Sequence, residues 1–141
     1  MKRTASAMWH GALKDGKGTV STESGVLQNT AYSYGTRFEE GKGTNPEELV
    51  AAAHASCFTM ALSAQLAEGG LKPDRLATNA DLTFEKADSG WTVTSIHLSV
   101  RGRVPGADTA TFDKAANAAK TSCPISRLLK TTITMDVKLE P

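Results

Sequence analysis

The sequence predicts an α+β protein in which antiparallel sheets are combined with a long central helix and a second, broken helix. Short runs of alternating polar and apolar residues fill the first third of the chain, an alanine-rich apolar segment follows, and two longer alternating runs come next. Alternation with a period of two is typical of strands, and alanine-rich apolar segments favour helix. Because strands and helices are grouped along the chain, we expect antiparallel sheets with segregated helices.

The first three predicted strands are short. We expect them at 4–9, 18–22 and 30–34, separated by polar turns that contain glycine, with a loop over 36–44. Runs of this kind, bounded by Gly, Ser and Asn, are typical of a small antiparallel meander.

The central helix has the strongest local signals in the chain. Asn45 is a good N-cap, Pro46 suits the first helical position, and the two glutamates that follow favour the positive end of the helix dipole. Good helix formers continue to Leu66, and the pair Gly69-Gly70 ends the helix.

The second half of the chain again combines alternating strand patterns with helical segments, and its strands are longer. We expect strands at 76–86 and 91–103, a helix at 109–121, a short helix that starts at Pro124 directly after Cys123, and a closing strand at 131–139.

Composition limits the class of protein. With 141 residues, 40% of them hydrophobic, the chain suits one domain spanning 1–141. Its 16 basic and 15 acidic side chains form no polybasic run, so neither nucleic acid nor an anionic membrane is expected as a partner. The apolar stretch 49–66 is interrupted by polar residues and is too polar for a transmembrane span. The N-terminus lacks the apolar segment of a signal peptide, so we expect a cytoplasmic protein.

Two cysteines are the main candidates for chemistry. Cys57 lies deep in the predicted central helix, where the helix dipole does little for its acidity, so a reactive Cys57 needs a nearby cation. Glu47 precedes Cys57 by about three helical turns and falls roughly on the same face. Arg37, in the preceding loop, can fold over that face and pair with both groups. Cys123 stands just before Pro124 in an N-cap-like position, where free backbone N–H groups stabilise a thiolate.

Plainer readings of the same residues stay open. Arg37 and Glu47 also fit a solvated surface pair, and both cysteines fit buried, inert core positions. His54, one turn before Cys57, is either a base, a metal ligand or a packed side chain. The sequence contains no nucleotide-binding glycine motif and no cluster with metal-ligand spacing. The residues by themselves therefore predict a possible two-cysteine redox pair and nothing sharper.

Whole segments of the chain resemble the OsmC family, the osmotically inducible relatives of the organic hydroperoxide resistance proteins. The matching segments are 18–25, 36–39, 43–58 and 123–126. The position of Arg37 resembles the OsmC branch, because in the hydroperoxide-resistance branch the equivalent arginine lies nearer the N-terminus. The resemblance implies an intertwined homodimer with two active sites at the subunit interface.

The resemblance also implies a function and a set of roles. Cys57 matches the peroxidatic cysteine and Cys123 the resolving cysteine, while Arg37 and Glu47 match the charged pair that holds the thiolate and orients the peroxide. The implied enzyme is a thiol peroxidase that reduces organic hydroperoxides, and hydrogen peroxide more weakly, in oxidative or osmotic stress defence. It would use no bound cofactor or metal, only an external dithiol or lipoyl-type reductant.

The resemblance also raises the question of which residues line the substrate pocket, and two other functions stay open. An apolar pocket would favour organic peroxides, and four side chains are candidate walls that fit plain core positions equally well: Phe38, Phe58, Met60 and Leu62. The alternatives are a redox-sensing thiol module without sustained turnover, and a structural protein with two inert cysteines.

Overall fold

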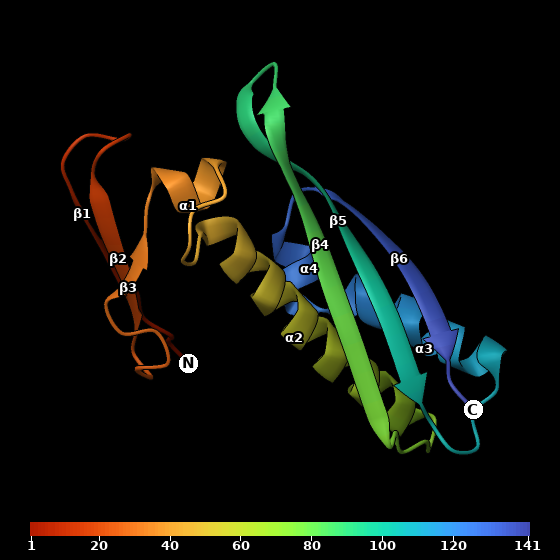
Figure 1. The fold of residues 1–141 in the computed structure, drawn as a ribbon. Coiled ribbons are helices and arrows are strands. Elements are labelled where there is room, and N and C mark those ends of the chain that lie inside the picture. Colours follow the sequence, from red (N-terminus) through yellow and green to blue (C-terminus); the bar gives the residue numbers. More distant parts are fainter. The chain divides into compact units, whose positions relative to one another are not determined.

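The computed structural model describes all residues, 1–141, and divides them into two compact units, 1–49 and 50–141. Each unit is described by itself. Both contain a three-stranded sheet, and four helices complete the fold (Figure 1). The predicted α+β class, with a long helix and a second helix broken near Cys123, is confirmed.

The first unit is built on an antiparallel meander. Strands β1 (Ala5–His10), β2 (Lys17–Thr22) and β3 (Thr30–Tyr32) pair in the order β1-β2-β3. In the middle of this sheet Gly18 lies between Trp9 and Tyr32, whose ring centroids are 5.5 Å apart. A Cβ atom at position 18 would come within 2.6 Å of both rings, so only glycine allows the two aromatic side chains to close over β2.

Residues Tyr34–Phe38 form a short helix, α1. The prediction that the third strand extends to 34 is therefore wrong, as is the first part of the predicted loop over 36–44. The cause of this helix is a capping box that the prediction missed. The Ser33 hydroxyl accepts a hydrogen bond from the Thr36 backbone N–H at 3.2 Å, and the Thr36 hydroxyl accepts one from the Ser33 backbone N–H at 2.8 Å. This helix places Arg37 in its last turn.

The long helix α2 (Pro46–Glu68) begins and ends where the sequence predicts. The Asn45 side chain accepts a hydrogen bond from the Glu48 backbone N–H at 2.8 Å, which confirms the N-cap. At the other end Gly70 adopts a φ of +75°, and the Leu71 backbone N–H donates to the Leu66 carbonyl at 2.9 Å. This left-handed turn closes the helix in the way that favours glycine.

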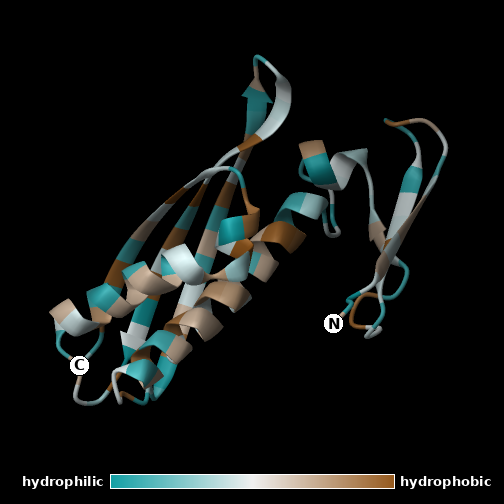
Figure 2. Ribbon diagram, turned by 180° about the vertical axis from the view of Figure 1, so that it is seen from behind, coloured by the Kyte–Doolittle hydropathy of each residue, from teal (hydrophilic) through white to brown (hydrophobic).

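The second unit packs helices on one face of a sheet. Strands β4 (Arg75–Ala87), β5 (Gly90–Arg103) and β6 (Thr132–Leu139) pair in the order β4-β5-β6. Helices α2, α3 (Thr109–Ser122) and α4 (Pro124–Leu128) cover the same face of this sheet (Figure 1). The strands alternate between hydrophobic and hydrophilic residues, as a sheet with one covered face requires (Figure 2).

One strand pair departs from the expected antiparallel arrangement. β4 and β5 are antiparallel, as the turn between them requires, but β5 and β6 are parallel. The reason is the connection: α3 and α4 lie between β5 and β6 in the chain, and a helical crossover returns the chain to run in the same direction. The crossover carries Cys123 at the junction of its two helices.

The core of the second unit lies between the sheet and the helices. α2 buries one row of side chains spaced four residues apart, namely His54, Phe58, Leu62 and Leu66. The three apolar members of this row form a cluster with the inward side chains of β5 and with Phe112 and Ala116 of α3. Phe58 and Phe112 are completely buried, so truncating either is expected to cost about 3–5 kcal/mol.

One face of α2 is exposed within the unit. Apolar residues extend along much of the helix (Figure 2), and in length and mean hydropathy, 1.4 over an 18-residue window, α2 alone among the helices is apolar enough to cross a membrane. A helix that forms the core of a soluble protein has the same properties. Its buried row faces the sheet, whereas residues 52, 56, 60 and 64 form an exposed row.

Candidate functional site

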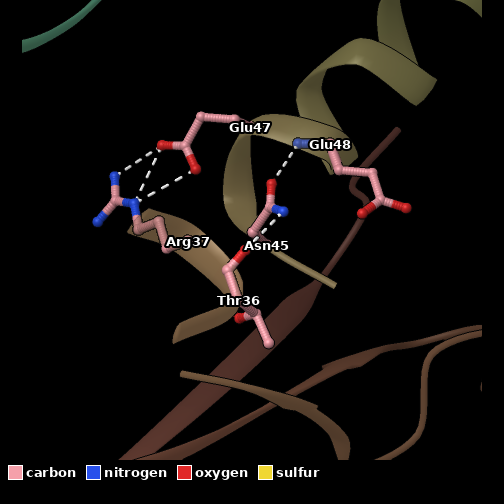
Figure 3. Close-up of polar contacts among 5 residues, drawn as sticks. All are labelled: Thr36, Arg37, Asn45, Glu47 and Glu48. Carbon is pink, nitrogen blue, oxygen red and sulfur yellow. Dashed lines mark hydrogen bonds and ion pairs between the residues drawn. The ribbon is translucent and has the colours of Figure 1, made fainter. Parts of the chain in front are cut away.

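Arg37 and Glu47 form the charged pair that the sequence predicts (Figure 3). Arg37 Nη2 lies 2.8 Å from Glu47 Oε1, and Arg37 Nε lies 3.1 Å from Oε1 and 3.3 Å from Oε2. Both carboxylate oxygens are therefore engaged, which fixes the plane of the guanidinium. Glu48 points away from Arg37, as its position in the helix predicts (Figure 3).

Local structure explains why these two residues meet. Asn45 caps α2 and also donates from Nδ2 to the Thr36 carbonyl at 3.0 Å, so it joins the start of α2 to helix α1 (Figure 3). Glu47 follows in the first turn of α2 and Arg37 in the last turn of α1. The side chain of Arg37 is 39% exposed and that of Glu47 only 13%, so the pair is not the fully solvated one of the plainer reading.

Arg37 also borders an aromatic hollow within the first unit. Its guanidinium lies 5.3 Å from the centroid of the Phe38 ring, within the range of a cation–π contact. The hollow has a volume of ≈ 250 Å³ and is lined by Trp9, Leu13, Tyr32, Ser33, Tyr34, Arg37 and Phe38. A charged group at the wall of an apolar hollow suits a ligand with one polar and one apolar end.

In the second unit Cys57 and Cys123 face each other. Their Sγ atoms are 3.1 Å apart and hydrogen-bonded, and no disulfide joins them. Cys57 is half-buried on α2, whereas Cys123 is completely buried between α3 and α4. A disulfide needs the sulfurs to approach to about 2.05 Å, so a movement of roughly 1 Å connects the thiol pair with the bonded pair.

The two thiols differ in acidity. Burial raises the pKa of the Cys57 thiol, and the hydrogen bond with Cys123 raises it further, while the Ile125 backbone N–H acts in the opposite direction. Burial also acts to raise the pKa of Cys123. There, hydrogen bonds from the Ser126 backbone N–H, the Cys57 thiol and the Ser126 hydroxyl outweigh burial, so the pKa of Cys123 lies below its usual range. Within this unit, Cys123 is the better thiolate.

His54 belongs to no group of side chains that could hold a metal ion, and it is a buried side chain with a hydrogen bond to Ser126. It is completely buried, its Nε2 lies 2.7 Å from the Ser126 hydroxyl oxygen, and its Nδ1 has no hydrogen-bond partner. Burial lowers the pKa of His54, so the ring is neutral near pH 7. Sequence reasoning missed Ser126, which the spacing of 72 residues from His54 conceals.

The predicted pocket walls divide between the core and the surface. Phe58 and Leu62 are completely buried and belong to the hydrophobic core, which is the plainer of their two predicted roles. Met60 is 76% exposed, and Phe38 lines the aromatic hollow beside Arg37. No group of three or more His, Cys, Asp or Glu side chains is placed to hold a metal ion.

The structure thus brings the four predicted site residues together as two pairs. Arg37 and Glu47 belong to residues 1–49, and Cys57 and Cys123 belong to 50–141. A common site formed by all four stays a prediction.

Comparisons with known proteins place these residues in a family context. Residues 39–138 match the family described as OsmC-like protein. Peroxiredoxin OsmC of Escherichia coli strain K12 is 51% identical over 138 residues, which cover 98% of this chain and 96% of that protein. Organic hydroperoxide resistance protein OhrB of Bacillus subtilis strain 168 is 30% identical over 124 residues, 87% of this chain and 88% of the other. The crystal structure of OhrB gives a TM-score of 0.72 at 24% identity, with 97% and 98% of the two chains covered, and supports the fold.

Proposed function

Since the chain belongs to the family of OsmC-like proteins, we propose that it is a thiol-dependent peroxidase that reduces organic hydroperoxides to alcohols in stress defence. The observation that carries the proposal is the cysteine pair: a half-buried Cys57 whose Sγ lies 3.1 Å from that of a buried Cys123. One sulfur is accessible for attack on a peroxide, and the second is in reach to remove the product of that attack.

The reaction proceeds in two steps. The Cys57 thiolate attacks the distal oxygen of the hydroperoxide, the O–O bond breaks, and the alkoxide leaves as an alcohol after taking up a proton; Cys57 becomes a sulfenic acid. The Cys123 thiolate then attacks the Cys57 sulfur, the S–O bond breaks, and hydroxide leaves and is protonated to water. A dithiol finally reduces the disulfide, which restores both thiols.

We assign to Arg37 the role of stabilising the thiolate form of Cys57. The pKa values of the isolated pair favour the thiolate on Cys123, because burial and the Cys123 hydrogen bond raise the pKa of Cys57. In this proposal a guanidinium placed beside Cys57 would lower the pKa of that thiol and would donate hydrogen bonds to the peroxide oxygens. Glu47, which engages Arg37 through both carboxylate oxygens, holds the guanidinium in position.

The surroundings of Arg37 support an organic hydroperoxide as the proposed substrate. The aromatic hollow beside it offers an apolar wall to the organic part of a hydroperoxide, which hydrogen peroxide lacks. The resemblance to the OsmC branch adds a dithiol or lipoyl-type molecule as reductant, the cytoplasm as the compartment, and no bound cofactor.

Consumption of cumene hydroperoxide and of hydrogen peroxide, measured side by side with dithiothreitol as reductant, tests this function. We expect sustained turnover of both, faster for the organic peroxide. A redox-sensing thiol module would consume one equivalent of peroxide and stop even with reductant present. No consumption of either peroxide would contradict the peroxidase function.

We also propose that two copies of the chain form a homodimer through α2. The support is the exposed row Ala52, Ser56, Met60 and Ala64, which leaves an apolar helix face uncovered within residues 50–141. Small side chains let another backbone approach closely, and Met60, 76% exposed, supplies the largest apolar surface of the row.

Met60→Glu is expected to shift the protein from dimer to monomer in analytical ultracentrifugation, because a buried unpaired carboxylate costs several kcal/mol, roughly 3–5, at an interface. Leu128→Glu, at a residue that is 74% exposed on α4, is the matched control and leaves the dimer intact. A wild-type monomer at micromolar concentration contradicts the proposal directly.

A further inference from the structure

Arg37 belongs to a helix that is too short to be stable by itself. α1 has five residues, Tyr34–Phe38. Isolated helices of fewer than about 12–15 residues are marginal in water, because the first turn fixes several residues for a single hydrogen bond. The position of the Arg37 guanidinium therefore depends on the contacts that connect α1 with the rest of residues 1–49.

The contacts at the start of α1 are local. Ser33 and Thr36 form the capping box, and the Thr36 hydroxyl also donates to the Ser33 carbonyl at 3.0 Å. Thr36 is only 8% exposed, so these hydrogen bonds are shielded from water. Because they join residues of the same turn, they form the helix but do not set its direction relative to α2.

Asn45 connects α1 with α2. Its Oδ1 accepts a hydrogen bond from the Glu48 backbone N–H at 2.8 Å, and its Nδ2 donates to the Thr36 carbonyl at 3.0 Å (Figure 3). One side-chain amide thus binds the residue before Arg37 and the first turn of the helix that carries Glu47. Asn45 therefore fixes the backbone on both sides of the ion pair.

Two glycines bring the connecting loop close to α1. The Gly41 backbone N–H donates to the Gly35 carbonyl at 3.0 Å, and a Cβ atom at Gly41 would lie 2.7 Å from the Gly35 carbonyl carbon. Real Cβ atoms do not approach backbone so closely, so any other residue at position 41 would displace the loop or the helix. Gly43 adopts a φ of +133°, which favours glycine.

We propose that Asn45 is a positioning residue for the attack on the peroxide: by joining the Thr36 carbonyl to the first turn of α2, it sets the distance and the plane in which Glu47 engages the Arg37 guanidinium. The inference rests on the proposed peroxidase function, to which it adds that the N-cap residue of α2 acts on the first step. Asn45 acts through the backbone of α1 and not by contact with the substrate.

The physical reason is preorganisation. An ion pair between two independently mobile segments gains little, because both side chains lose conformational freedom when they pair. The Asn45 amide joins the two segments beforehand, so Arg37 and Glu47 meet at 2.8 Å without that loss. A guanidinium held in one orientation can direct its N–H groups at a reacting atom, whereas a mobile one does so for only part of the time.

The two roles of Asn45 are separable by substitution. Asn45→Asp and Asn45→Ser both keep an oxygen that caps α2, but neither places an N–H donor against the Thr36 carbonyl. The serine variant does so without adding a charge. Asp108→Ala is the matched control for a weakened cap, because Asp108 accepts from the Thr111 backbone N–H at 2.7 Å and caps α3 instead.

A second perturbation leaves Asn45 in place. Gly41→Ala introduces the Cβ atom that meets the backbone of α1, so it should displace Arg37 in the same way. Gly69→Ala is its control, because a Cβ atom there would lie 3.5 Å from the Leu66 carbonyl oxygen, an ordinary contact.

The rate of the first step is measured by mixing reduced protein with one equivalent of cumene hydroperoxide in the absence of reductant, over a range of pH. We expect both Asn45 variants and Gly41→Ala to lose about 10-fold at neutral pH, within the roughly 100-fold that a misplacement of one ångström can cause. Their rates should recover as the pH rises, because Cys57 then ionises without help. Both control variants should keep the rate and the pH profile of the wild type.

A second readout is independent of turnover. Arg37 Nε lies 3.1 Å from Glu47 Oε1, so its N–H proton should exchange slowly with water in a nuclear magnetic resonance spectrum, where its signal is assigned by its loss in Arg37→Lys. We expect several-fold faster exchange in both Asn45 variants and in Gly41→Ala, and unchanged exchange in both control variants.

The two readouts distinguish failure of the inference from failure of the proposed function. Unchanged exchange in the Asn45 variants overturns the inference, whether or not the protein consumes peroxide. Faster exchange with an unchanged rate in an active protein also overturns it, because the guanidinium then does not need to be fixed. Faster exchange in the variants of a protein that consumes no peroxide overturns only the proposed function.

Discussion

Cys57→Ser is expected to reduce hydroperoxide consumption to the rate of the uncatalysed reaction between dithiothreitol and peroxide. In the proposed cycle the Cys57 thiolate is the group that attacks the peroxide, and a serine hydroxyl is a far weaker nucleophile than a thiolate at neutral pH. The fold should be unaffected, because Cys57 is half-buried and serine has nearly the same volume. Coupled turnover with cumene hydroperoxide measures the loss.

Cys123→Ser is the matched control for this change, since it alters the other sulfur of the same pair. It should keep one rapid turnover and then accumulate sulfinic acid on Cys57, visible as two added oxygens in the mass of the protein. Full activity in Cys57→Ser would show that a different residue attacks the peroxide. Loss of the first turnover in Cys123→Ser, with that turnover kept in Cys57→Ser, would assign the attack to Cys123.

Arg37→Met is expected to lower the rate of the first step at neutral pH by about 10- to 100-fold. A cation within a few ångströms of a thiol lowers its pKa by roughly 1–3 units, and without it the burial of Cys57 and its hydrogen bond to Cys123 keep that pKa high. Because the thiolate that remains is more nucleophilic, the loss in rate is smaller than the loss in thiolate. The activity should recover as the pH rises.

Arg75→Met provides the control for the removal of an arginine. Arg75 pairs with Glu140 at 2.7 Å in the second unit, as Arg37 pairs with Glu47 at 2.8 Å in the first. Its loss should leave both the rate and the pH profile unchanged. Arg37→Lys keeps the charge but not the bidentate geometry, so an intermediate rate is expected. A normal rate in Arg37→Met would remove Arg37 from the site.

Much of the fold could be predicted because its signals are local. The Asn45-Pro46 entry, the Gly69-Gly70 end and the alternation along β4, β5 and β6 each depend on a few neighbouring residues. The family could also be predicted, because the resemblance depends on short continuous segments of sequence. The segments 43–58 and 123–126 lie within the matched region 39–138. The short helix α1 was missed because its capping box, Ser33 with Thr36, interrupts what otherwise looks like a strand.

The parts that could not be predicted depend on contacts between distant residues. The parallel pairing of β6 with β5 follows from how the crossover packs, and the strand itself has the same alternation as an antiparallel one. Phe58 and Leu62 share a helix with Met60, and only packing against the sheet shows that they are core residues. Ser126 meets His54 through the packing of α4 against α2, which no local pattern reports.

A disulfide between Cys57 and Cys123 would also change the stability of the fold. The two residues are 66 positions apart, so a bond between them closes a loop that contains β4, β5 and α3. Closing a loop of that length removes conformational entropy from the denatured ensemble, worth about 4 kcal/mol in the chain-entropy description. In the proposed cycle the protein would therefore alternate between an open chain and a cross-linked one. When the reductant is used up, the protein would remain in the disulfide-bonded form, which is harder to unfold.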